Sequence, residues 1–288
     1  MSITIMTAKG SIPLTALLLL CVSMSAQSGW LKPKGEGYAQ LSAVVFSSDN
    51  YYNLNGDQLT TTKYQSYGIT GYAEYGLSDK FNLLFNGPLL RQQAFSTSEA
   101  TYGVGDVRIG GKYALHANDW PISIAVEAEL PLSPETQFAR NDVQNIPGFI
   151  DQINLPASDG EFNVWTTLAA SRSLSEKSFV SAFGAFNLRT EGLSHQFLTA
   201  VEVGYKFFDK LYVMGKLSAQ RSIGEPTAGL SFVRGESVAY TAAGLTLFYE
   251  INEHFNLVAS GTTYSDLIFS RKNIYSGTPL SVGVAYKW

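Results

Sequence analysis

The sequence is poor in cysteine, in histidine and in charge. Its 288 residues include one cysteine and three histidines, and charged residues make up 15% of the total. The cysteine, Cys21, lies in a segment that we expect to be removed, so the mature chain has neither disulfides nor thiol chemistry. The charged fraction is low for a soluble protein. No basic run or face is present, which argues against nucleic acid as a partner.

The sequence also lacks a run of 18 apolar residues and a long amphipathic helical pattern. Its longest apolar run, LTALLLLCV from Leu14 to Val22, is too short to span a bilayer. Lys9 precedes this run and the small residues Ser23 and Ser25 follow it, as in a secretory signal peptide. Leu20, directly before Cys21, argues against a lipoprotein. We therefore expect a signal peptide at 1–25 and one domain at 26–288.

Alternation with period two is the dominant pattern of the remaining chain. In one stretch, Val107, Ile109, Gly111, Tyr113 and Leu115 alternate with a second series that carries charges. Similar series recur along the chain, and 26 glycines, 16 tyrosines and 17 phenylalanines suit strands and turns. On the register of these strands, one set of charged residues shares the face opposite the apolar one: Glu74, Arg108, Lys112, Glu127, Glu129, Glu202, Lys206 and Lys216.

Short turns and longer polar links alternate between the strands, which is typical of an outer-membrane barrel. The predicted fold class is all-β, a transmembrane antiparallel β-barrel with both ends on the periplasmic side. Counts of ten or fourteen strands remain alternatives to twelve, and the sixth and seventh strands are the least clear. The predicted strands are 37–47, 62–76, 80–90, 104–115, 121–131, 161–173, 178–189, 196–207, 210–221, 238–250, 254–267 and 277–288.

A soluble β-sandwich would alternate as well, because one face of each sheet meets a core. Two features favour the barrel. The non-apolar face is rich in Gly, Ala, Ser and Thr with isolated charges of both signs, which suits a confined lumen. The apolar face carries Tyr and Phe near the strand ends, which suits an interfacial girdle. The inward charges either pair with each other to brace the wall or tune the selectivity of a polar conduit.

The sequence offers little for catalysis. His116, His195 and His254 fall at different ends of the predicted barrel, so they cannot share one metal site, and no cofactor motif is present. The glycines of GVGDVRIGG (103–111) have the wrong spacing for a nucleotide loop and lead into a strand. Ser194 with His195 is the one candidate pair for a lipid-modifying enzyme. We expect no enzyme, no cofactor and no metal.

The longest link, 131–161, contains a small apolar group: Ile146, Phe149, Ile150 and Ile153. The favoured interpretation is an exposed surface loop. The alternative is a loop folded into the barrel mouth as a constriction or ligand contact.

The chain ends on LSVGVAYKW (280–288), in which Leu280, Val282, Val284, Tyr286 and Trp288 alternate with small or polar residues. This pattern predicts the last barrel strand, which pairs with the first to close the sheet, with an aromatic ring in the periplasmic girdle. Tyr286 and Trp288 are the predicted C-terminal assembly signal.

Several phrases resemble a family of Gram-negative outer-membrane transporters: GWLKPKGEGYAQLS, AEYGLSDKFNLLF, YGVGDVRIGGKYAL, VEAELPLSP and SDGEFNVWTTLAASRSL. They are similar to the "MetA-pathway of phenol degradation" family and to XagA-type barrels. The resemblance implies an outer-membrane barrel that passes small, often hydrophobic or aromatic, molecules. It transfers no catalytic or ligand residue, and the long 131–161 link departs from it.

The predicted function is therefore an outer-membrane channel for a small-molecule solute. The predicted partners are outer-membrane lipid, the outer-membrane assembly machinery and that solute. The alternatives are a structural or surface-interaction barrel with a plugged lumen and, as a minor one, a lipid-modifying enzyme.

Overall fold

The computed structural model describes residues 28–141, 152–224 and 235–288. The predicted signal peptide, and Ile146, Phe149 and Ile150 of the long link, lie outside these ranges. Across the described ranges, no helix has the length and apolar character needed to cross a membrane.

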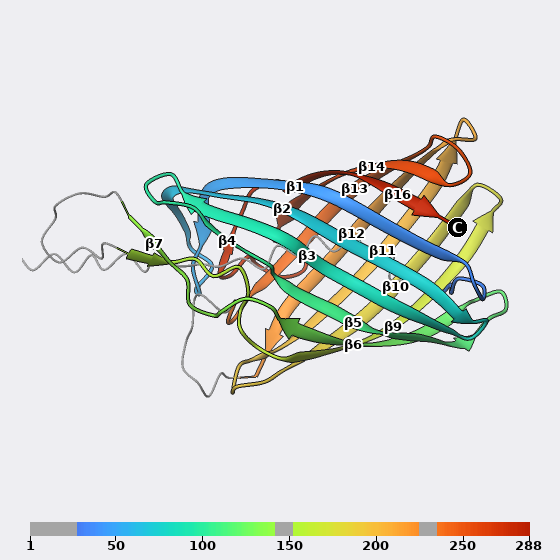
Figure 1. The fold of residues 1–288 in the computed structure, drawn as a ribbon, viewed down its shortest axis with the longest axis horizontal. Helices are drawn as coiled ribbons and strands as arrows, with labels where there is room; N and C mark the ends of the chain where they lie inside the picture. The colour runs from blue at the N-terminus through green and yellow to red at the C-terminus, as the bar shows by residue number, and fades with distance from the viewer. Residues whose placement is uncertain (1–27, 142–151, 225–234) are drawn as a thin grey trace, which may run out of the picture.

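The described residues form sixteen strands, drawn in Figure 1. They are β1 (Gly37–Tyr52), β2 (Gln58–Ser78), β3 (Phe81–Phe95), β4 (Thr101–Gly103), β5 (Asp106–His116), β6 (Ile122–Pro131), β7 (Phe138–Arg140), β8 (Gln152–Asn154), β9 (Asn163–Ser175), β10 (Ser178–Arg189), β11 (His195–Phe207), β12 (Leu211–Ile223), β13 (Ala239–Glu250), β14 (Phe255–Ser265), β15 (Ile274–Tyr275) and β16 (Leu280–Lys287).

Twelve long strands close into one antiparallel barrel, which confirms the predicted fold class and strand count. Each strand of the barrel pairs with the next along the chain. Strand β1 pairs with β2 on one side and with β16 on the other, so the sheet closes on itself. The closing register runs from Tyr38↔Lys287 to Val45↔Leu280. Closure leaves no free edge, so every strand can satisfy its backbone groups without water.

Four short strands lie outside these twelve and were not predicted. Strand β4 pairs with β3 and β15 pairs with β1, while β7 and β8 form a separate hairpin inside the 131–161 link. The strand predicted at 104–115 begins two residues later, at Asp106, and continues to His116. The first two strands are longer than predicted and leave only residues 53–57 between them.

Burial follows the predicted alternation in the last strand. Leu280, Val282 and Val284 are 52%, 64% and 46% exposed, whereas Ser281 and Ala285 of the alternate series are buried. Large apolar side chains on the outside of a closed sheet suit a lipid environment and would be a liability in water. The wall therefore turns its apolar series outward and its small and polar series inward.

The two ends of the barrel differ in their connections, as predicted. We call one the short-turn end, where the links are 79–80, 117–121, 176–177, 208–210 and 251–254. We call the other the long-loop end, where the links include 132–137, 155–162, 190–194 and 266–273. Strand β7 and the C-terminus lie at opposite ends in Figure 1, at the long-loop and the short-turn end respectively.

The end of β16 fastens the short-turn end to the start of β1. The Gly37 and Trp288 backbones exchange hydrogen bonds of 3.0 and 3.2 Å. A Cβ on Gly37 would lie 2.1 Å from the Trp288 ring, so only glycine lets the indole pack there. Trp288 stacks on Tyr286 with ring centroids 5.7 Å apart, and both side chains stay about 40% exposed.

Candidate functional site: the barrel lumen

The eight charged residues predicted to share one face are all buried or half-buried. Glu74, Arg108, Lys112, Glu127 and Glu129 are 3–5% exposed, while Ile109, between two of them, is 50% exposed. Glu202, Lys206 and Lys216 are half-buried. A buried charge is tolerated when it is paired or hydrogen-bonded, so the partners of these groups indicate how the interior is organised.

The structure brings several of these charges together. Lys112 donates to Glu74 at 3.1 Å, and Arg108 lies 3.8 Å from Glu129. Glu74 also accepts hydrogen bonds from Asn82 at 2.7 Å and from Tyr72 at 3.0 Å. These contacts favour wall bracing for these two pairs, and a selectivity role for them stays a prediction.

The remaining predicted charges have other neighbours. Lys206 pairs with Glu250 at 3.1 Å, a residue that the sequence analysis did not select. Glu202 and Lys216 face each other directly across the β11–β12 ladder.

The largest charge cluster of the described residues was not predicted from the sequence. Arg189, at the end of β10, is fully buried and binds Glu161 through two bonds of 2.6 and 3.1 Å. The same guanidinium donates to Glu236 at 3.2 Å and lies 3.7 Å from Asp159. Ser194 donates its hydroxyl to Glu236 at 2.6 Å. We call Arg189, Asp159, Glu161 and Glu236 the arginine cluster; it ties two long-loop segments to the wall.

Burial changes the acidity of two carboxyl groups in this cluster. Desolvation, together with the charges of Asp106, Glu161 and Glu129, raises the pKa of Asp159 well above its usual value. Desolvation likewise raises the pKa of Glu161 to about 7, although the Arg189 guanidinium opposes the shift. A cavity of about 60 Å³ lies beside the cluster, with Arg108, Trp165 and Gln196 among its lining residues.

The described second part of the 131–161 link is folded into the barrel, so the favoured interpretation of an exposed loop is wrong for these residues. Ile153 and residues 155–159 are buried. The wall side chains Arg91, Gln93 and Thr101 donate to the backbone carbonyls of Ala157, Pro156 and Leu155 at 3.1, 2.8 and 2.6 Å. Ser158 hydrogen-bonds Asp106 of β5.

An aromatic cluster fills the rest of the long-loop half. Tyr64 stacks on Tyr275 with centroids 5.1 Å apart and contacts Phe46 and Phe95 at 6.1 and 5.4 Å. Ile153 and Leu155 of the inward loop pack in the same cluster. Side chains and the inward loop therefore occupy much of this half of the lumen.

A second insertion occupies the short-turn half. Residues 28–36, which precede β1, run across the interior of the barrel. The Gly29 amide donates to the Ser171 hydroxyl at 2.8 Å, and Ser123 donates to the Ser28 carbonyl at 3.0 Å. Trp30 makes an edge contact with Phe179 of β10 at 5.7 Å. A Cβ on Gly29 would lie 1.9 Å from the Pro121 carbonyl oxygen, so glycine permits this close approach.

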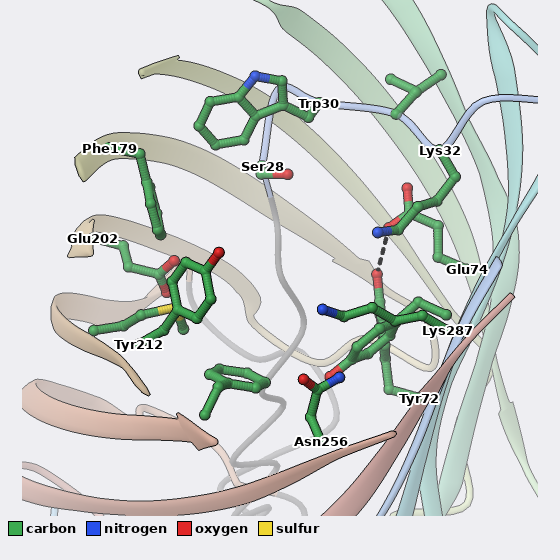
Figure 2. Close-up of a pocket in the computed structure, with 14 residues that line it drawn as sticks. Ser28, Trp30, Lys32, Tyr72, Glu74, Phe179, Glu202, Tyr212, Asn256 and Lys287 are labelled. Atoms are coloured by element: carbon green, nitrogen blue, oxygen red, sulfur yellow. Dashed lines mark hydrogen bonds between the residues drawn. The ribbon is translucent and has the colours of Figure 1, made fainter. Parts of the chain in front are cut away.

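Between this segment and the wall lies a cavity of about 340 Å³, shown in Figure 2. Its lining comes from the inserted segment and from strands around much of the barrel. One part is apolar, with Trp30, Phe179, Tyr212, Met214 and Phe248. Its charged and amide-bearing lining residues are Lys32, Glu74, Glu202, Asn256 and Lys287. We call this cavity the short-turn pocket.

Asn256 is the unusual member of this pocket. It is 1% exposed, and neither its Oδ1 nor its Nδ2 has a hydrogen-bond partner among the described residues. Leaving a buried amide unpaired costs about 1–3 kcal/mol, so such a group calls for a bound partner.

The candidate enzyme residues do not form a pair. The Ser194 hydroxyl donates to Glu236, whereas the His195 Nδ1 accepts from the Arg189 amide at 3.2 Å. His116 and His254 lie at the short-turn end, away from His195, as predicted. Within the described ranges, no group of three or more His, Cys, Asp or Glu side chains could hold a metal ion.

A closed barrel with an apolar outer belt and a polar, partly hollow interior defines a transmembrane β-barrel of the outer-membrane type. The fold is similar to that of an outer-membrane channel from Pseudomonas putida F1, with a TM-score of 0.63 and 13% identity over 89% of this chain and 97% of that one. It is also similar to the NanC porin, with a TM-score of 0.51 and 8% identity over 86% and 100% of the two chains.

The translocator domain of the autotransporter NalP from Neisseria meningitidis is a third similar barrel, with a TM-score of 0.53, 10% identity and coverage of 89% and 90%. At these identities the likeness establishes the fold. No protein-family model matches the chain. The comparison with curated proteins finds no match either.

Proposed function

We propose that the chain is an outer-membrane channel through which a small molecule passes along the barrel lumen. The observation that carries this proposal is the short-turn pocket, a hollow of about 340 Å³ inside a closed, lipid-facing wall. A barrel of intermediate strand number can be either open or filled, and here the interior is hollow in one half. The likeness to an outer-membrane channel supports the proposal through the shared fold.

The solute class is part of this proposal. The lining by Trp30, Phe179, Tyr212, Met214 and Phe248 suits a small molecule with an apolar or aromatic body. The resemblance to the phenol-degradation family, which no protein-family model bears out, would imply the same class. In this channel, the 152–161 loop and residues 28–36 narrow the pathway at its two ends.

The proposal is tested by current recordings on purified protein in planar bilayers. The wild-type protein is compared with a variant in which residues 134–160 are replaced by a short Gly-Ser linker between β6 and β9. We expect discrete conductance steps that become larger in the variant, because the loop occupies the long-loop half. If both proteins fold but neither gives any conductance, the channel proposal is overturned.

A second candidate is a structural or surface-interaction barrel with a plugged lumen. The filled long-loop half favours it, since the arginine cluster and the aromatic cluster together leave little space there. Silence in both recordings, combined with loss of a surface phenotype when the loops are shortened, would establish this candidate instead.

A further inference from the structure

The polar side of the short-turn pocket presents the cation Lys32, near Glu74 but without a carboxylate at ion-pair distance in the described part of the chain. Among the described residues, Lys32 has no ion pair, and its ammonium lies 5.5 Å above the Tyr38 ring. The nearby carboxylate of Glu74 is already engaged by Lys112, Asn82 and Tyr72. Burial is the main cause that lowers the pKa of Lys32; the charge of Glu74 opposes this shift, and the charge of Lys287 adds to it. A bound anion at this place would balance the positive charge of Lys32.

A second cation faces the same space. Lys287 comes from β16, and Figure 2 shows its ammonium and that of Lys32 on one side of the cavity, with Asn256 nearby. Within the described ranges, Glu250 is the one carboxylate paired with Lys287, at 3.5 Å, and Lys206 binds the same carboxylate more closely, at 3.1 Å. Two ammonium groups and an unpartnered amide therefore converge on one region.

The opposite side of the pocket is aromatic. Phe179 and Tyr212 lie across the cavity from the two lysines in Figure 2, and Trp30 packs edge-on against Phe179. Glu202 is on this side as well, but Lys216 faces it directly across the β11–β12 ladder. The pocket thus has an apolar wall, and the cationic end opposes it.

We infer that the short-turn pocket binds a small aromatic carboxylate, with its ring on the Phe179–Tyr212 wall and its carboxylate between Lys32 and Lys287. The carboxylate also accepts a hydrogen bond from the Asn256 amide, in addition to those from the two lysines. This gives the buried amide a partner. This inference rests on the proposed function, because it names the solute of the same lumen. An uncharged aromatic would leave the lysines unmatched, and inorganic phosphate would gain nothing from the apolar wall.

The test is calorimetric titration of the full-length barrel in detergent with benzoate, benzyl alcohol and inorganic phosphate. We expect saturable binding of benzoate and at least about tenfold weaker binding of the other two. Lys32→Met keeps the side-chain stem but removes the charge, and Asn256→Ala removes the amide. Each should weaken benzoate binding about tenfold.

Lys34→Met is the matched control, since Lys34 lies in the same segment but does not line the pocket. It should keep the wild-type affinity. Because Lys32 lies outside the strands, its replacement should leave the barrel folded, which heat-modifiable gel migration checks for every variant. Benzoate affinity that is unchanged in Lys32→Met, or equal to that of benzyl alcohol, overturns the inference.

The inference and the channel proposal fail in different ways. A barrel that conducts ions but binds no benzoate contradicts the ligand and leaves the channel standing. A silent barrel that still binds benzoate, with the affinity lowered in Lys32→Met, contradicts the channel and supports the site.

Discussion

The two halves of the lumen are built from the same strands, but inserted segments occupy much of one half and leave a pocket in the other. In the long-loop half, segments return into the barrel and pair with the inward polar groups, as Glu161 and Glu236 do with Arg189. In the short-turn half, residues 28–36 cross the interior but leave a pocket with an unpaired amide at Asn256. The alternation of the wall supplies polar groups to both halves, and the inserted segments decide which of them stay available for a solute.

The largest effect is expected at the arginine cluster. Arg189→Met would leave Glu161, Glu236 and Asp159 buried without their shared cation. We expect the free energy of unfolding to fall by about 3–5 kcal/mol, because breaking a buried ion pair strands its partners. Urea titration in lipid vesicles, followed by tryptophan fluorescence, measures this loss.

Lys177→Met serves as the control, since its pair with Asp209 is 3.6 Å long and largely exposed. It should change the free energy by less than about 1 kcal/mol. Equal effects of the two substitutions would show that the arginine cluster does not hold the long-loop half together.

The next effect concerns assembly of the wall around both halves. Deleting Trp288 removes the ring that covers Gly37 and two backbone hydrogen bonds of the barrel closure. We predict a several-fold lower amount of folded protein in the outer membrane, measured by heat-modifiable migration of membrane fractions. Trp120→Ala, at an exposed short turn, should leave this amount unchanged. Normal levels of the deletion variant would remove Tyr286 and Trp288 as an assembly signal.

The pH dependence of stability tests the long-loop half, where Glu161 is buried. The folded pKa of Glu161 is about 7, above its ordinary value of 4.5, so the folded state holds a proton that the unfolded chain releases. The free energy of unfolding should therefore fall as the pH rises from about 4.5 to about 7. Glu161→Gln should flatten this slope in urea titrations at several pH values. The exposed Glu253→Gln should keep it, and identical slopes in all three proteins would contradict the assignment.

The smallest effect is expected from the inserted segment of the short-turn half. Gly29→Ala places a Cβ against the Pro121 carbonyl and should displace residues 28–32 from the wall. We expect a modest rise in conductance with an unchanged urea midpoint, because the strands are not altered. Lys34→Ala in the same segment should change neither quantity. A lower midpoint without a change in conductance would show that the segment braces the barrel and does not narrow it.

Much of the barrel wall could be predicted because its physics is local. Period-two alternation and turn residues located all twelve barrel strands. These include β9 and β10, the sixth and seventh predicted strands, whose sequence pattern is the least clear. The same alternation placed Arg189 on the inward series of β10, so its burial was readable in principle, although it was not selected.

The inserted segments could not be predicted in this way. Residues 152–161 have no periodicity, and their place depends on distant wall groups such as Arg91 and Gln93. The place of residues 28–36 was not predicted either, because the contact of Gly29 with Ser171 joins positions far apart in the sequence. Contacts between residues so far apart leave no local sequence pattern. The short-turn pocket could therefore not be predicted either.

The most direct test of the lumen as the pathway uses the absence of cysteine after Cys21. Met214→Cys places a thiol in the short-turn pocket, and Val203→Cys places one on the exposed outer face. A charged methanethiosulfonate reagent is added to each protein during planar-bilayer recording. We predict a stepwise loss of current for Met214→Cys and none for Val203→Cys. Full modification of Met214→Cys, verified by mass spectrometry, with an unchanged current would contradict the account.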